Sequence, residues 1–121
     1  MSHRILIVDD EPNIVISLEY LMKKQGYEVA VATDGEAALR QAAAFAPDLI
    51  LLDVMMPKKS GFEVCQALRS DPAQTAVKLI MLTAKGRETE VAKGLALGVD
   101  AYITKPFSTK DLLLKIKSLL T

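Results

Sequence analysis

The sequence is poor in the residues that build disulfide frameworks and histidine-based sites. It has one cysteine, one histidine and no tryptophan. Cys65 has no second cysteine with which to form a bridge, so a small secreted fold held together by disulfides is excluded. His3 is equally alone, which excludes a histidine metal cluster and leaves a histidine-centred triad without a partner.

The sequence also lacks a net charge and a long hydrophobic run. Its 15 basic and 15 acidic residues balance, which leaves no basic footprint for nucleic acid or for an anionic membrane. No apolar stretch approaches the ~20 residues that span a bilayer, and the N-terminus lacks the apolar segment of a signal peptide. We therefore expect a cytoplasmic protein that binds neither nucleic acid nor membrane directly.

The chain does have enough apolar residues for one core. Half of its 121 residues are hydrophobic, which suffices for a domain without disulfide or metal support. No linker, repeat or low-complexity segment interrupts it. We predict a single domain over residues 1–121.

Short apolar runs alternate with longer stretches of helical period. The runs are rich in Ile, Val and Leu, as in parallel strands buried on both faces, and cover residues 5–8, 29–32, 49–52, 79–82 and 101–103. Helical periodicity follows each run, at residues 14–22, 37–44, 62–68, 91–95 and 112–120. Because crossovers between parallel strands are right-handed, this pattern predicts an α/β fold. We expect a doubly wound, five-stranded parallel sheet of flavodoxin-like order 2-1-3-4-5, in a three-layer sandwich.

Polar residues follow four of the five apolar runs, at the carboxyl ends where open parallel sheets bind ligands. The second run, on the expected edge strand, has no comparable charged end. In the order 2-1-3-4-5 the other four ends converge on one crevice. They carry Asp9 and Asp10, Asp53, Thr83, and Lys105.

Three carboxylates placed together repel one another and require a cation, and such hard oxygen ligands suit Mg²⁺. With Lys105 and Thr83 added, the set suits a phosphoryl group, for which a carboxylate is a competent acceptor. Singly, Asp10 could cap a helix, Asp53 could open a turn and Lys105 could be a solvated loop residue. Their convergence on neighbouring strands favours a shared site.

Several segments of the sequence resemble the response regulator receiver family, and the similarity covers essentially the whole chain. No single segment is specific, but five in order at the right separations are. They are residues 7–12 (IVDDEP), 51–57 (LLDVMMP), Gly61, 82–84 (LTA) and 102–107 (YITKPF).

The resemblance implies a role for each matching residue. Asp53 would be the phosphoacceptor, and Mg²⁺, for which Mn²⁺ could substitute, would be bound by Asp10, by Asp53 and by the backbone carbonyl of Met55. Asp9 would act on the metal through a bound water. Lys105 and Thr83 would bind the phosphoryl group, with Lys105 pairing with Asp53 before phosphorylation. Thr83 and Tyr102 would form the switch. The Lys105–Pro106 bond would be cis.

The resemblance also implies a signalling switch rather than an enzyme, one that assists its own phosphorylation and slow dephosphorylation. Its phosphodonor would be a sensor histidine kinase or a phosphotransfer protein. Its output would be carried by a surface of helix 4, strand 5 and helix 5, and a phosphorylation-dependent dimer is compatible with this. Helical period places Leu114 opposite the apolar stripe of the last helix, and we expect it to be exposed on that surface.

Three other classes compete with this reading. A flavin-binding electron carrier would need a Ser/Thr-rich phosphate loop where the chain has Asp9, Asp10 and Glu11. An aspartyl-phosphate phosphohydrolase typically has an acid two residues after its nucleophile, where the chain has Met55. A degenerate receiver that only binds a protein would not need the complete set of acids and lysine. A phosphodonor assay separates the last two classes from a receiver. A phosphohydrolase would turn the donor over, a degenerate receiver would not be labelled, and a functional receiver would be labelled stoichiometrically.

Overall fold

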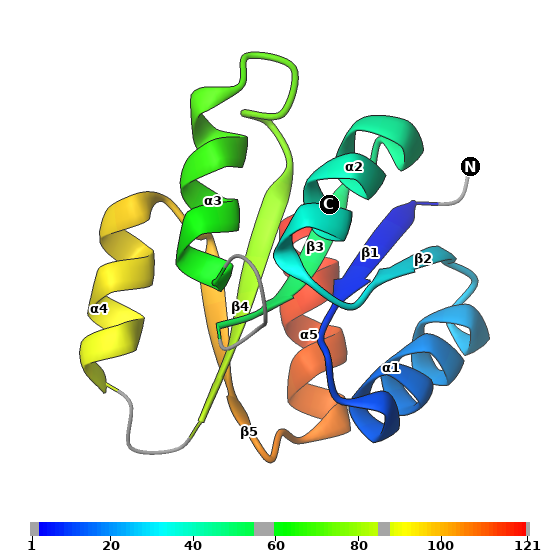
Figure 1. The fold of residues 1–121 in the computed structure, drawn as a ribbon. Coiled ribbons are helices and arrows are strands. Elements are labelled where there is room, and N and C mark those ends of the chain that lie inside the picture. The colour runs from blue at the N-terminus through cyan, green and yellow to red at the C-terminus, as the bar shows by residue number, and fades with distance from the viewer. Residues whose placement is uncertain (1–2, 55–59, 85–87, 121) are drawn as a thin grey trace.

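The structure, a computed structural model, describes residues 3–54, 60–84 and 88–120. Strands and helices alternate from end to end, as the apolar pattern predicts (Figure 1). The strands are β1 (Arg4–Val8), β2 (Glu28–Ala32), β3 (Leu49–Asp53), β4 (Lys78–Ala84) and β5 (Ala101–Lys105). The helices are α1 (Pro12–Lys24), α2 (Gly35–Phe45), α3 (Gly61–Ser70), α4 (Glu88–Leu97) and α5 (Thr109–Leu120).

All strand pairs in the sheet are parallel, and the order is β2-β1-β3-β4-β5. This confirms the predicted order. Strand β1 lies between β2 and β3, so the chain reverses its direction of winding there.

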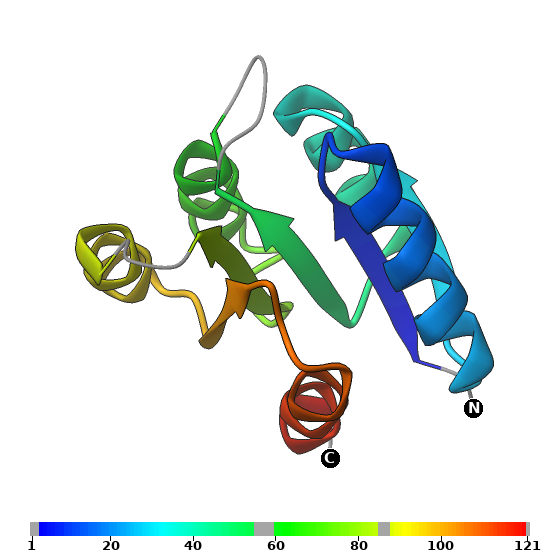
Figure 2. The ribbon, with the colours of Figure 1, turned by 90° about the horizontal axis from the view of Figure 1, so that it is seen from below.

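Helices cover both faces of the sheet (Figure 2). Alternate strand residues point to opposite faces, which divides the core into two clusters. On one face, Ile7, Leu51 and Ile80 pack against Leu18 of α1 and Leu112 of α5. The other face packs against α2 and α3, and it includes Leu97 at the end of α4. Both faces are buried, which explains why the strands read as continuous apolar runs.

The helix boundaries have local causes. Pro12 occupies the first position of α1, where its missing N–H costs no hydrogen bond. Gly26 and Gly98 adopt positive φ angles of 89° and 101° just after α1 and α4, which is the usual conformation of a helix C-terminal cap. The Ser108 hydroxyl accepts a hydrogen bond from Asp111 N at 3.3 Å, which caps α5.

Three strands extend past the carboxyl ends of their apolar runs, and β3 does so by one residue, Asp53. β4 includes Thr83 and β5 includes Lys105, so these polar residues lie within the last rungs of the sheet. Within the part of the chain that the structure describes, no helix is both long and apolar enough to cross a membrane.

Candidate functional site

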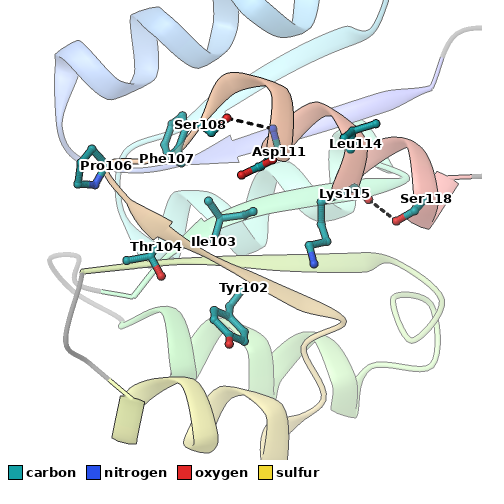
Figure 3. A pocket seen from close by; sticks show the side chains of 10 residues that line it. All are labelled: Tyr102, Ile103, Thr104, Pro106, Phe107, Ser108, Asp111, Leu114, Lys115 and Ser118. Atoms are coloured by element: carbon teal, nitrogen blue, oxygen red, sulfur yellow. Dashed lines mark hydrogen bonds between the residues drawn. The ribbon is translucent and has the colours of Figure 1, made fainter.

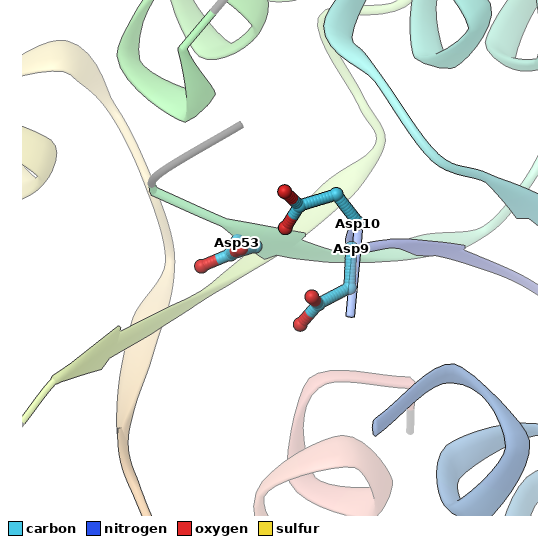
Figure 4. A group of neighbouring side chains, drawn as sticks. All are labelled: Asp9, Asp10 and Asp53. Atoms are coloured by element: carbon cyan, nitrogen blue, oxygen red, sulfur yellow. The ribbon is translucent and has the colours of Figure 1, made fainter. Parts of the chain in front are cut away.

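Three carboxylates meet at the carboxyl edge of the sheet (Figure 4). One oxygen from each of Asp9, Asp10 and Asp53 lies within 4.8 Å of the others. Asp9 is 0% exposed and Asp53 is 6% exposed, whereas Asp10 is open to solvent. The cluster is thus rooted in the core and reachable on one side.

The sheet register brings these residues together. Val8 pairs with Leu52, so Asp9 and Asp53 follow at the ends of adjacent strands. Side-chain alternation puts Asp9 on the same face as Ile7, and Asp53 on the same face as Leu51. Two strands that are far apart in sequence therefore deliver carboxylates to one edge and one face.

The end of β5 supplies a cation to the same cluster. Lys105 Nζ lies 2.9 Å from Asp9 Oδ2 and 3.4 Å from Asp53 Oδ1. Burial opposes the charged ammonium, but the hydrogen bond to Asp9 and the charges of both carboxylates outweigh it, and the pKa of Lys105 is raised. The Lys105–Pro106 bond is cis, as the resemblance implies.

Asp9 is engaged through both of its oxygens. Oδ2 accepts the hydrogen bond from Lys105, and Oδ1 accepts one from Glu11 N at 2.9 Å. The family resemblance implies only a contact between Asp9 and a metal-bound water. That Lys105 lies nearer to Asp9 than to Asp53 has no signal in the sequence, because it depends on side-chain directions and not on which residues end the strands.

Thr83 and Tyr102 lie on the two strands at the other side of Asp53. Thr83 follows Leu82, the β4 partner of Asp53, and is 3% exposed. Tyr102 pairs with Met81 and is 43% exposed, so its ring is directed outward in this structure. Thr83 and Met81 alternate onto one face of β4, which makes Thr83 and Tyr102 diagonal neighbours on that face.

The donor set fits a hard divalent cation. Three carboxyl groups and one lysine together have a formal charge of −2, which one divalent ion would neutralise. All the donors are oxygens, as Mg²⁺ prefers. One oxygen of Asp10 and one of Asp53 lie within 4.8 Å of each other, a separation that a single ion can bridge. Met55, the third residue implied to bind the metal, lies outside the described residues.

A groove of about 820 Å³ lies between β5 and α5, separate from the acidic cluster (Figure 3). It is lined by Tyr102 and Thr104 from β5 and by Leu114 and Lys115 from α5. Leu114 is 57% exposed, which confirms the expectation from helical period. The predicted output surface therefore presents both apolar and charged groups.

Comparisons with known proteins point to one family. The family described as the response regulator receiver domain matches residues 5–117. The alkaline phosphatase synthesis transcriptional regulatory protein PhoP of Bacillus subtilis is 47% identical over 120 residues, which cover 99% of this chain and 49% of PhoP. The chain thus spans about half the length of that relative.

Two solved structures are similar throughout. Chemotaxis response regulator CheY4 of Vibrio cholerae has 31% sequence identity and a TM-score of 0.92, covering 98% of this chain and 99% of CheY4. The receiver domain of sensor histidine kinase PA1611 from Pseudomonas aeruginosa PAO1 has 28% identity and a TM-score of 0.90, covering 98% of both chains. That structure has a magnesium ion coordinated in its active site cleft.

Proposed function

The chain belongs to the response regulator receiver domain family of two-component systems, and we propose that all of residues 1–121 form one receiver in which Asp53 accepts the phosphoryl group. The observation that carries the proposal is the meeting of Asp53 with Asp9, Asp10 and Lys105 at the carboxyl edge of the sheet. A carboxylate nucleophile, two further acids and a cation are the groups that this transfer requires.

In the transfer, a carboxylate oxygen of Asp53 attacks the phosphorus atom of the donor. The new O–P bond forms as the bond to the leaving group breaks, and the leaving group departs with the electron pair. Lys105 Nζ lies 3.4 Å from Asp53 Oδ1, and from this position the ammonium group can neutralise charge on the phosphoryl oxygens. Mg²⁺, with Mn²⁺ as a substitute, would be held by Asp10 and Asp53 and would neutralise the charge that the acids and the phosphoryl group share.

The donor that fits is a phosphohistidine on a sensor kinase or a phosphotransfer protein, whose imidazole is a good leaving group. The protein acts as a switch that promotes its own phosphorylation and the slow hydrolysis of the resulting aspartyl phosphate. It would operate in the cytoplasm. Thr83, 3% exposed at the end of β4, is assigned the hydrogen bond to a phosphoryl oxygen.

Labelling with a small phosphodonor tests the acceptor. Acetyl phosphate with Mg²⁺ should add one phosphoryl group to the protein, measured by intact-mass spectrometry, and excess chelator should prevent it. Asp53→Asn should abolish labelling, whereas Asp71→Asn, at the end of α3, should leave it unchanged. The assignment would be contradicted if Asp53→Asn were labelled as fully as wild type, or if wild type were labelled in excess chelator.

The output surface is assigned to α4, β5 and α5, with Thr83 and Tyr102 as the link from the acceptor. When Thr83 moves toward a phosphoryl group, space is left beside β5 and an inward rotamer of Tyr102 gains population. The position of the two residues on one face of β4 and β5 supports this coupling. It would control an effector region or partner, and a phosphorylation-dependent dimer would use the same surface.

Fluorine NMR of labelled Tyr102 tests the link, with beryllofluoride and Mg²⁺ as the phosphoryl mimic. Wild type should show a shift of the Tyr102 resonance, and Thr83→Ala should bind the mimic but lose most of that shift. An equal shift in both proteins would show that Thr83 carries no signal.

A further inference from the structure

The C-terminal end of α4 is capped by side chains of α3. The last carbonyls of a helix have no partner within the helix. Here Cys65 Sγ donates to Leu97 O at 3.5 Å, and Arg69 Nε donates to Gly98 O at 2.8 Å. Cys65 and Arg69 are four residues apart, so they lie on one face of α3. Two successive turns of α3 therefore satisfy the last carbonyl of α4 and the carbonyl of the glycine that follows it.

The chemistry of both side chains suits this role. Cys65 is fully buried, and burial raises the pKa of its thiol, so the sulfur keeps the proton that it donates. Arg69 brings a positive charge to the negative end of the α4 dipole. Gly98 has a φ of +101°, and a Cβ there would lie 3.4 Å from Arg69 Cγ and Nε. A Cβ at that distance would make ordinary van der Waals contact, so the positive φ is what favours glycine at this position.

The same guanidinium reaches three more groups. Arg69 Nη1 donates to Thr75 O at 3.2 Å and to Val77 O at 2.7 Å, and Nη2 pairs with Asp100 Oδ2 at 2.9 Å. Asp100 Oδ2 also accepts a hydrogen bond from Leu79 N at 2.8 Å, at the start of β4. One partly buried charge therefore joins α3, the start of β4 and the turn before β5.

The other end of α4 lies nearer the acidic cluster. In this parallel fold, α4 begins at Glu88, five residues after Thr83, and runs back toward the amino edge of the sheet (Figure 1). Midway along, Lys93 Nζ lies 4.6 Å from the centre of the Phe62 ring of α3. The charge-assisted contacts of Arg69 are thus at the end of α4 that is farther from Asp53.

We propose that Cys65, Arg69 and Asp100, here called the α4 anchor, hold the C-terminal end of α4 in place, so that phosphorylation tilts the N-terminal half of the helix about that end. This inference rests on the proposed function. Hydrogen bonds to charged groups are stronger than neutral ones, and the anchor ties α4 to α3 and β4, which are rooted in the core. Within α4, movement is therefore confined to the half that lies next to the acceptor.

Amide hydrogen exchange, measured by NMR, tests the anchor without any ligand. The probes are the amides of Gly98 and Val99, which donate to Leu95 O and Gly94 O of α4. Arg69→Met should speed their exchange about tenfold or more relative to the core amides of Ile7 and Leu51. Arg69→Lys keeps the positive charge but loses the several N–H donors of the guanidinium group, so it should speed exchange in the same way but more weakly. This variant keeps the proposal testable if Arg69→Met does not fold. Arg40→Met, an exposed arginine of α2, is the control and should change neither ratio.

Beryllofluoride with Mg²⁺ tests the tilt. In wild type, amide shifts should concentrate in the first half of α4 and leave Gly98 and Val99 in place, and in the Arg69 variants those two amides should shift as well. Unchanged relative exchange in both Arg69 variants, or equal shifts at both ends of α4 in wild type, would overturn the proposal. Absence of a bound-fluoride ¹⁹F signal in wild type would instead contradict the proposed function.

Discussion

Asp10→Asn should raise the free energy of unfolding of the metal-free protein and weaken the binding of Mg²⁺ to the folded protein. Asp10 lies within 4.8 Å of two other carboxylates, while one lysine contacts the cluster. A pair of unit charges at that distance interacts by about 0.9 kcal/mol in water and about 3.5 kcal/mol at an effective dielectric constant of 20. Removing Asp10 eliminates its repulsion by Asp9 and Asp53, and it also loses the attraction of the Lys105 charge, which lies beside those two acids. The net gain is about the energy of one pair. Because Asp10 is exposed, we expect the low end, a gain of about 1 kcal/mol in the free energy of unfolding.

Mg²⁺ should reverse this advantage. At a concentration one hundred times its Kd, a ligand that binds only the folded state adds about 2.7 kcal/mol to the free energy of unfolding. If the loss of one anionic ligand weakens binding about tenfold, the same concentration adds only about 1.4 kcal/mol to Asp10→Asn. The variant should therefore be the more stable protein in chelator and lose that lead in Mg²⁺.

Urea unfolding followed by circular dichroism, at constant ionic strength with EDTA or with Mg²⁺, measures both effects. Asp71→Asn is the matched control, since asparagine keeps the oxygen that accepts a hydrogen bond from Ala73 N, and its response to Mg²⁺ should equal that of wild type. The reasoning is refuted if Asp10→Asn is the less stable protein in EDTA, or if Mg²⁺ stabilises it as much as wild type.

The remaining predictions concern charge, backbone and core. The raised pKa of Lys105 means that its ion pairs contribute stability that is fully present below its ordinary value of 10.5 and is lost as pH rises through the higher folded value. Urea unfolding above pH 10 should therefore show a steeper loss of stability in wild type than in Lys105→Met, and parallel curves would contradict this. Ala46 has a φ of 52°, so Ala46→Gly should relieve backbone strain and raise Tm. The gain in the free energy of unfolding should be at most about 1 kcal/mol, because glycine also has more conformational entropy to lose on folding. A lower Tm would count against this prediction. Leu18→Ala should cost about 2 to 5 kcal/mol because Leu18 is fully buried, whereas Ile16→Ala, on the exposed face of α1, should cost under about 0.5 kcal/mol. Equal losses in the urea unfolding of these two variants would show that α1 packs through another face.

Most of the fold could be predicted because each element has a local signal. Strands buried on both faces read as apolar runs, and Pro12 and Gly98 mark helix ends through φ preferences that require no tertiary contact. Leu114 was predicted to be exposed because the helical period alone decides which side of α5 it occupies. The extra strand residues at Thr83 and Lys105 were not predicted, since pairing with neighbouring strands, rather than apolar character, extends β4 and β5.

By itself, the sequence determined which residues stand at the carboxyl ends of the strands, and so the membership of the acidic cluster. The tertiary structure decided how those residues share their contacts. Lys105 lies closer to Asp9 than to Asp53, and Arg69 of α3 caps α4 and pairs with Asp100. Such choices depend on side-chain directions and on the separation of elements that are distant along the chain. Local periodicity and turn preferences carry no information about those distances, which are set only when the helices pack on the sheet.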